Sequence, residues 1–183
     1  PIRIRRMTDA LSMIRKDPVS TAAALIALVG LATIIGFLFF EHVLGYEPCA
    51  LCLDQRKAFY VAVPLAVLLC LGAGFGASRK VLFLGFLVIA VAMLWNTGLA
   101  AFHAGVEWKF WPGPADCSGP VSNFGSAGDM LNRLQTIRIA RCDDAPWRLF
   151  GISMAGYDVM ISAFLVAVAA VGAKAAWARP EPE

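Results

Sequence analysis

The chain has 183 residues, of which 59% are hydrophobic and 16% are charged, and its net charge is +3. A soluble domain would carry a charged fraction nearer about one quarter, so the composition indicates a membrane protein. The length leaves room for one small helical bundle and one long loop, without a second domain. The basic residues are scattered, and they form no footprint for nucleic acid.

Four apolar segments are long enough to cross a bilayer, which takes about 20 residues. We expect transmembrane helices at residues 19–44, 57–77, 80–102 and 155–177, with polar loops at 45–56 and 103–153. The predicted fold class is therefore an all-α membrane protein, a four-helix bundle that forms one domain over residues 1–183. Asp158 and Lys174 lie near the ends of the last segment, where interfacial anchoring suits them better than burial.

The basic residues predict the orientation of the chain. Five of them precede the first segment, and the turn Ser78-Arg79-Lys80 between the second and third segments is short and basic. By the positive-inside rule both termini face inside. The first segment is too long for a signal peptide, and no small-residue cleavage site follows it. In a bacterium both polar loops would then face the oxidising side of the inner membrane, where cysteines form disulfides.

The first polar loop contains Pro48, Cys49, Cys52 and Arg56. A helix can begin just after Pro48, which places Cys49 near its cap and Cys52 in its first turn. Free backbone N–H groups at a helix N-terminus stabilise a thiolate, and Arg56 lies four residues beyond Cys52 on the same face. We therefore expect a lowered thiol pKa at Cys52 and a cationic site suited to a carbonyl oxygen or a developing anion.

Other interpretations of these cysteines are weaker. A zinc site would need a second closely spaced pair, and Cys117 and Cys142 lack that spacing, although His42 and His103 could complete a metal set. Haem attachment needs a histidine directly after the second cysteine, where Leu53 stands. Cys70 lies within the second apolar segment and is expected to be a small buried apolar residue.

The second polar loop holds the other two cysteines. It begins with an aromatic and Pro/Gly-rich run, and residues 129–141 have the pattern of an amphipathic helix that lies on the membrane or packs on the bundle. A Cys117–Cys142 disulfide would close a loop of about 25 residues, and a purely structural role could explain it. A Cys49–Cys52 disulfide constrains little chain, and such short bridges are typically redox-active. Two pairs therefore suggest successive thiol–disulfide exchange.

The ordered set of motifs resembles the DsbB family of bacterial disulfide-bond-forming membrane proteins over nearly the whole chain. The matching residues are Phe39-Phe40-Glu41-His42-Val43, Pro48-Cys49-Ala50-Leu51-Cys52, Arg56, His103, Cys117, Cys142-Asp143, Trp147 and Gly151-Ile152-Ser153-Met154. The resemblance implies a quinone-dependent thiol:disulfide oxidoreductase in the bacterial inner membrane. Its implied partner is a periplasmic thioredoxin-fold oxidase similar to DsbA, and its cofactor is ubiquinone or menaquinone.

The resemblance also implies residue roles. Cys117 would be attacked by the reduced partner, and Cys142 would be its disulfide partner. Cys49 would exchange with the loop pair, including a transient link to Cys117, and Cys52 would face the quinone. Arg56 would be the quinone-binding cation. His103 matches a family histidine near the quinone.

Gln55 stands where some relatives carry an acidic residue, which puts an acid–base role at that position in doubt. Two alternatives remain. A protein similar to vitamin K epoxide reductase also has four helices and a Cys-x-x-Cys motif, but there the loop pair precedes that motif. A structural or partner-binding membrane protein with a disulfide-stapled loop is the alternative from another class.

Overall fold

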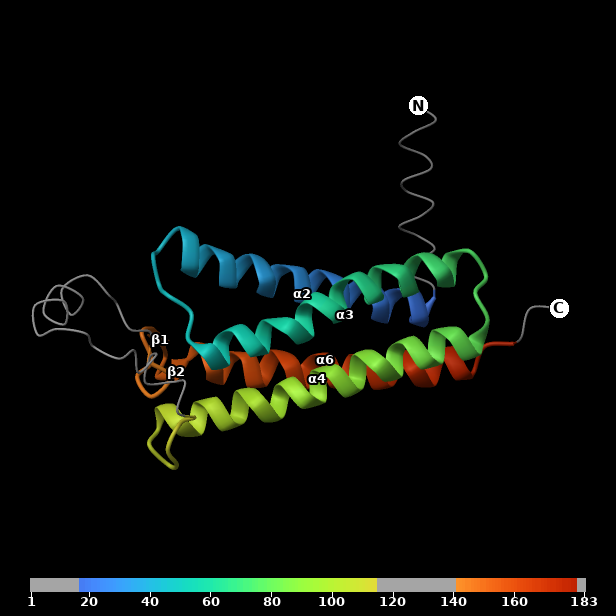
Figure 1. Ribbon diagram of the computed structural model, residues 1–183. Helices are drawn as coiled ribbons and strands as arrows, with labels where there is room; N and C mark the ends of the chain where they lie inside the picture. The colour runs from blue at the N-terminus through green and yellow to red at the C-terminus, as the bar shows by residue number, and fades with distance from the viewer. Residues whose placement is uncertain (1–16, 115–140, 181–183) are drawn as a thin grey trace, which may run out of the picture.

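The computed structural model describes residues 17–114 and 141–180. Its elements run in the order α2 (Pro18–His42), α3 (Ala50–Gly74), α4 (Arg79–Glu107), β1 (Arg148–Leu149), β2 (Ile152–Ser153) and α6 (Met154–Trp177). The four long helices run side by side (Figure 1), and each is long and apolar enough to cross a membrane. The predicted all-helical membrane fold is thereby confirmed for its four spans, with one short β-hairpin added.

Each long helix begins at a residue whose side chain accepts a backbone N–H of the first turn. These N-cap residues are Asp17, Cys49, Ser78 and Ser153. A cap satisfies a donor that has no partner within the helix. Because Cys49 caps α3, this helix begins at Ala50, as predicted for a helix that starts just after Pro48, and the transmembrane segment predicted from residue 57 lies further along it. Helix α4 continues to Glu107, past the predicted end at 102, since helical structure extends beyond the uncharged stretch on which the prediction relied.

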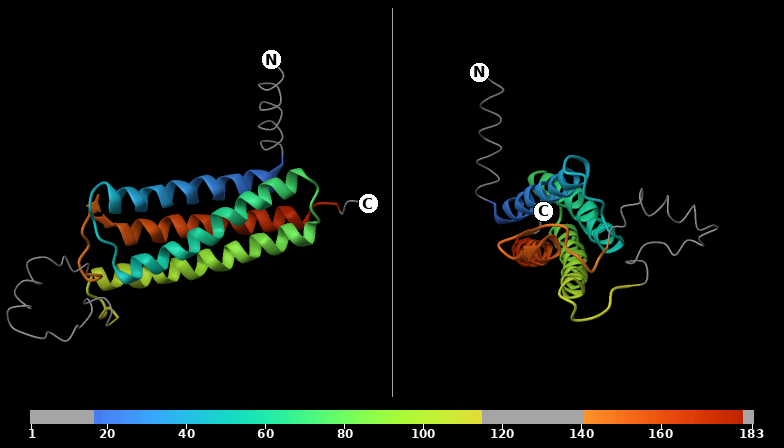
Figure 2. Two further views of the ribbon diagram at one scale, coloured as in Figure 1. Left: turned by 45° about the horizontal axis from the view of Figure 1, so that its top comes forward. Right: turned by 90° about the vertical axis from the view of Figure 1, so that its left-hand side faces the viewer.

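The helices alternate in direction, so both connections that carry cysteines lie at one end of the bundle (Figures 1 and 2). At the other end lie the turn between α3 and α4, the start of α2 and the end of α6. An ion pair between Asp17 and Arg179 joins those last two segments. The predicted amphipathic helix at 129–141 lies outside the described residues, apart from Arg141.

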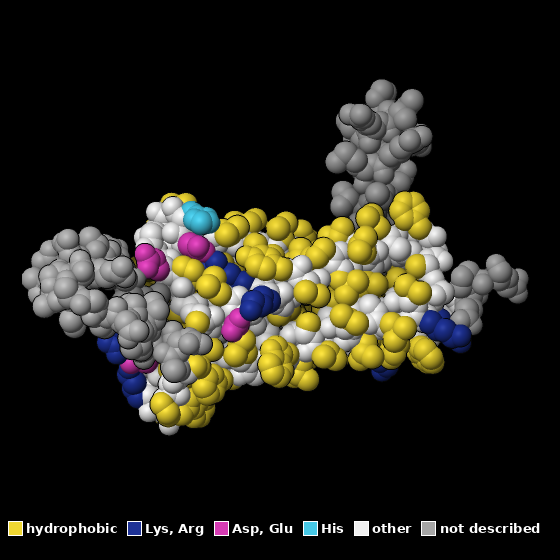
Figure 3. Space-filling model, in the orientation of Figure 1, with side chains coloured by type: hydrophobic (Ala, Val, Ile, Leu, Met, Phe, Trp, Pro, Cys, Tyr) yellow, Lys and Arg dark blue, Asp and Glu magenta, His cyan; other side chains and the backbone are white. Residues whose placement is uncertain are grey.

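Small residues let the helices approach closely, as is usual in membrane bundles. A Cβ atom at Gly172 of α6 would lie 2.5 Å from the ring of Phe86 of α4, so only glycine fits there. Phe86, Phe59 and Met93 are fully buried in the core. Many large apolar side chains are instead exposed along the sides of the bundle (Figure 3), as expected for a surface that faces lipid.

Asp158 corrects a prediction. Rather than anchoring α6 at the interface, it is 2% exposed and packs inside the bundle. Asn96 of α4 donates to both carboxylate oxygens of Asp158, at 3.3 and 3.1 Å, and Ser162 donates to one of them at 3.1 Å. Ser162 lies one turn further along the same helix, whereas Asn96 comes from α4, and the sequence pattern could not reveal that contact between helices.

Candidate redox site

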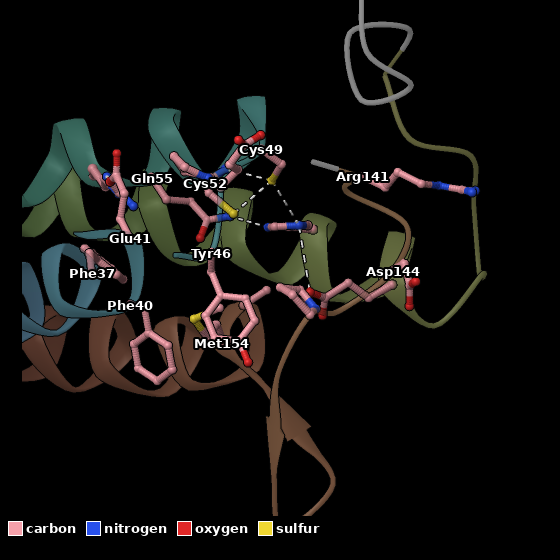
Figure 4. A pocket seen from close by; sticks show the side chains of 17 residues that line it. Phe37, Phe40, Glu41, Tyr46, Cys49, Cys52, Gln55, Arg141, Asp144 and Met154 are labelled. Carbon is pink, nitrogen blue, oxygen red and sulfur yellow. Dashed lines mark hydrogen bonds and ion pairs between the residues drawn. The ribbon is translucent and has the colours of Figure 1, made fainter. Parts of the chain in front are cut away.

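Cys49 and Cys52 lie at the N-terminus of α3, as predicted. Cys49 is the N-cap, and its sulfur accepts a hydrogen bond from the backbone N–H of Cys52 at 3.3 Å. The two sulfurs are 2.8 Å apart, and both cysteines are free thiols. The two side chains face each other at the end of α3 (Figure 4), and the redox-active Cys49–Cys52 disulfide stays a prediction.

The stabilised thiolate is Cys49 rather than Cys52, contrary to the prediction. The hydrogen bond with Cys52 is the main factor that lowers the pKa of the Cys49 thiol to about 5, and burial opposes it. A further contact, with His103, lowers the pKa of Cys49 in addition. Since Cys49 is the cap itself, its sulfur receives the free N–H groups at the helix end, whereas Cys52 lies inside the first turn.

His103 lies beside this pair, which places the predicted residue in the site. It comes from the last part of α4, is 3% exposed, and its Nε2 atom is 3.7 Å from the Cys49 sulfur. The amide nitrogen of Gln55 lies 2.9 Å from Nδ1 of the same ring. Which of the two groups donates across this contact depends on the tautomer of the ring, and Nε2 is the nitrogen that faces Cys49.

Glu107 lies one helical turn beyond His103, and its carboxylate is 3.9 Å from Nε2 of that ring. The side chain of Glu107 is also buried. It accepts a hydrogen bond from the hydroxyl of Ser153, the residue that caps α6. The β-hairpin places Ser153 there, because Phe150 and Gly151 form its two-residue turn, both with positive φ (50° and 82°). Segments distant in sequence thus fix the carboxylate beside the ring.

Arg56 lines the same cavity as the two cysteines, but its guanidinium is paired with Glu41 of α2. It also lies over the ring of Phe37, 5.5 Å from the centroid. The guanidinium acts electrostatically on Cys52, in line with its expected place on the same helix face, but its ion pair is with a carboxylate, the stronger partner for a guanidinium. Arg56 remains a buried cation at the site.

Cys142 approaches the pair from the second loop. It is disulfide-bonded and fully buried. Its sulfur, the Cys49 sulfur and a ring nitrogen of His103 all lie within 4.8 Å of one another. These three atoms could surround a metal ion, but a sulfur held in a disulfide cannot supply the thiolate that a metal needs. Cys117, and with it the predicted Cys117–Cys142 pairing, lies outside the described residues.

Charged groups hold the backbone next to Cys142. Asp143 accepts hydrogen bonds from Arg141 and from Lys109 of the loop that follows α4, and the Lys109 ammonium also donates to the Asp143 carbonyl at 2.6 Å. The hydrogen bonds from Arg141 and then Lys109 lower the pKa of Asp143 well below its usual range. These hydrogen bonds connect the loop after α4 to the segment that carries Cys142.

Two hollows meet at the site. A cavity of about 60 Å³ is lined by both cysteines and by Arg56 and His103. A larger groove of about 450 Å³ runs between α2 and α6 and is almost entirely apolar. Phe37, Phe40 and Met154 line both, so the groove leads along the bundle to the cysteine pair.

No role was predicted for Glu41, Glu107 or Ser153. Glu41 is part of a matching motif, but its pairing with Arg56 spans two helices. Glu107 could have been found from its spacing, because residues four apart on a helix lie on one face. Ser153 is also part of a matching motif, but its contact with Glu107 depends on the hairpin.

Comparison with known proteins identifies the family of the chain. Residues 19–172 match the family model of the disulfide bond formation protein DsbB. The chain is 28% identical to disulfide bond formation protein B of Shewanella loihica over 163 residues, covering 87% of this chain and 91% of the relative. It is 34% identical to a probable disulfide formation protein of Deinococcus radiodurans over 61% of this chain and 73% of that one. It is 35% identical to disulfide bond formation protein B of Xanthomonas axonopodis pv. citri over 61% of this chain and 64% of that relative. The chain belongs to the DsbB family of bacterial membrane proteins that form disulfide bonds.

Proposed function

We propose that this protein reoxidises a periplasmic DsbA-like thiol oxidase and passes the electrons through its two cysteine pairs to a membrane quinone. The observation that carries the proposal is the closeness of two cysteine sulfurs that come from the two loops. The sulfur of Cys49, whose thiol pKa is lowered, lies within 4.8 Å of the disulfide-bonded sulfur of Cys142. A thiolate next to a disulfide sulfur is the arrangement from which exchange proceeds.

The exchange between the pairs uses these two sulfurs. In the forward direction a reduced loop pair gives a thiolate at Cys142, which attacks a Cys49–Cys52 disulfide at Cys49 and releases Cys52 as a thiolate. A second attack by the other loop cysteine on Cys142 then frees Cys49 and closes the loop disulfide. Two electrons pass from the loop pair to the first pair. Here the sulfur that meets Cys49 is that of Cys142; the earlier expectation of a Cys49–Cys117 link stays a prediction.

The residues around the pair fit a quinone. The apolar groove between α2 and α6 suits an isoprenoid tail, and Arg56 and His103 offer donors to a carbonyl oxygen where the groove reaches the cysteines. A bound quinone would accept the two electrons and two protons of the Cys49–Cys52 dithiol. The groups of this chain hold the dithiol buried, stabilise one thiolate and provide a cation.

The end of the bundle that carries the cysteines is assigned to the periplasmic side of the inner membrane. The basic residues before α2 and between α3 and α4 support this orientation by the positive-inside rule. The oxidising periplasm suits the disulfide at Cys142, and the DsbA–DsbB–quinone chain is a general example of how a bacterial periplasm is kept oxidising.

The test is anaerobic mixing of the purified protein, a reduced DsbA-like oxidase and a short-chain ubiquinone, followed by the ultraviolet absorbance of the quinone. We expect stoichiometric loss of quinone absorbance with the wild-type chain. The loss should disappear in Cys52→Ser, which breaks transfer to quinone, and in Cys117→Ser, which breaks transfer from the partner. Menaquinone tested in the same way identifies the preferred acceptor. Failure with both quinones and several oxidases would contradict the proposal.

A further inference from the structure

A buried carboxylate lies close to the reactive cysteine, and the function proposed above gives it no role. Glu107 is 8% exposed, in a bundle where an unpaired charge is costly. Its carboxylate is 3.9 Å from Nε2 of His103, the same nitrogen that lies 3.7 Å from the Cys49 sulfur. The ring nitrogen thus lies between a sulfur that loses a proton and a carboxylate that favours positive charge.

A hydrogen bond from the start of α6 also holds the Glu107 carboxylate in place. The Ser153 hydroxyl donates to it, and the same oxygen accepts the backbone N–H of Gly156 at 3.2 Å. Ser153 is therefore fixed by the start of α6 and cannot turn away without breaking the cap. Such a chain of oriented groups resembles the nucleophile, base and orienting acid of hydrolytic triads in its logic, although the nucleophile here is a thiol.

We propose that Glu107 is a positioning residue that acts through His103: its carboxylate, held by Ser153, stabilises the imidazolium formed when His103 takes the thiol proton of Cys49. The step is Cys49–SH plus neutral His103 giving Cys49–S⁻ plus protonated His103, with Glu107 remaining a carboxylate. The inference rests on the proposed function for its purpose. When the dithiol is oxidised, two electrons and two thiol protons leave together, and His103 carries one of those protons.

Gln55 can hold the ring with Nε2 free to take the proton. The end of its amide lies 2.9 Å from Nδ1, and the amide oxygen, once turned to that position, accepts the hydrogen of Nδ1 in both the neutral ring and the imidazolium. Nε2 of the neutral ring then carries no hydrogen and can accept the thiol proton of Cys49.

Other charged groups surround the ring, and none replaces Glu107. Asp158 of α6 acts on His103 electrostatically, but its hydrogen bonds are made with Asn96 and Ser162. Arg56 and Glu41, from α3 and α2, pair with each other. From β1, Arg148 acts electrostatically on Glu107. Among the described residues, Glu107 is the carboxylate within 4.0 Å of the ring nitrogen.

The test uses the full chain in detergent without quinone or partner, with the first pair reduced and the Cys142 disulfide intact. The rate at which iodoacetamide alkylates Cys49 is measured from about pH 4 to about pH 9 and resolved from the other cysteines by peptide mass spectrometry. In Glu107→Gln we expect the midpoint of the rate profile to move upward by about one pH unit.

The sign of this shift decides the inference. A carboxylate that acted on the thiolate directly would repel it, so its removal would move the midpoint downward. A midpoint that is unchanged or lower in Glu107→Gln overturns the proposal. In a His103→Asn background the upward shift should vanish, and its persistence there would show that Glu107 does not act through the ring.

Two further variants keep the test decisive. Glu107→Asp retains the charge on a shorter side chain and should give an upward shift smaller than that of Glu107→Gln. If Glu107→Gln does not fold, Glu107→Asp alone decides the test, and a midpoint in Glu107→Asp at or below that of the wild type overturns the proposal. Asp158→Asn removes the other carboxyl and should shift the midpoint less than Glu107→Gln; an equal shift would also overturn it. Because no quinone is present, a wild-type chain that reduces no quinone contradicts the proposed function and leaves this result standing.

Discussion

The guanidinium of Arg56 and the carboxylate of Glu41 form an ion pair that joins α3 to α2 beside the cysteine pair. The side chain of Arg56 is 10% exposed and that of Glu41 is 26% exposed, so water screens the pair only in part. If a quinone oxygen binds Arg56, as proposed above, it competes with a carboxylate of the protein itself. On that proposal the affinity for quinone depends on both residues.

Replacing Glu41 by Gln should lower the Michaelis constant for quinone by about threefold to tenfold, because a neutral amide competes less for the guanidinium. Arg56→Ala should raise the same constant. Steady-state quinone reduction at saturating partner measures both. Asp54→Asn is the matched control, since the Asp54–Lys57 pair is exposed and should not matter. An unchanged constant in both Glu41→Gln and Arg56→Ala would remove these residues from the quinone site.

The alkylation of Cys49 should depend on pH as expected for a thiol of pKa about 5. Because the pKa is lowered, the thiolate persists as the pH falls toward about 5, and the rate should be nearly constant above about pH 6. Cys52→Ala removes the hydrogen bond between the sulfurs and should move the midpoint upward. Cys52→Ser keeps a hydroxyl donor and should move it less. Equal midpoints in the two variants would show that the hydrogen bond is not the cause.

The buried cluster of Asn96, Asp158 and Ser162 should contribute to stability. The Nδ2 atom of Asn96 also donates to Ser162 at 2.8 Å. Asn96→Ala leaves the carboxyl of Asp158 with Ser162 alone, and we expect a loss of about 1–3 kcal/mol in the free energy of unfolding. Thermal unfolding in detergent, followed by tryptophan fluorescence, measures the loss.

Thr97→Val is the control for this cluster, because the Thr97 hydroxyl bonds only its own helix, to the carbonyl of Met93 at 2.8 Å. It should change stability little. A similar loss of unfolding free energy in Thr97→Val and Asn96→Ala would mean that the buried cluster does not contribute more to stability than a hydrogen bond within one helix.

Helix packing can be tested at two glycines. Gly172→Ala should destabilise the bundle by about 1–3 kcal/mol, because the added methyl group would lie 2.5 Å from the Phe86 ring. Gly98→Ala lies in α4 with nothing within 4 Å of the added Cβ, and it should be neutral or slightly stabilising. The same unfolding assay compares the two variants, and equal effects would argue against the close approach of α4 and α6.

The sequence predicted the parts of the molecule that depend on local physics. Long uncharged runs predicted the four spans, and Pro48 predicted that α3 begins at the cysteine pair. Contacts between segments could not be predicted in this way. Whether Arg56 would meet a sulfur or Glu41, and whether Asp158 would face lipid headgroups or Asn96, depends on how helices far apart in sequence are rotated against each other. A single amino-acid sequence contains no direct record of that rotation.

The sulfur of Cys49 is the acceptor that caps α3, and in the proposed function it is also the atom that is oxidised and reduced. A thiolate is a strong acceptor for the Cys52 amide, whereas a sulfur in a disulfide is a weak one. Oxidation of the pair therefore loosens the first turn of the helix, and reduction tightens it. The amide hydrogens of that turn should exchange with solvent faster in the oxidised protein, so the oxidation state of two atoms is reported by the backbone around them.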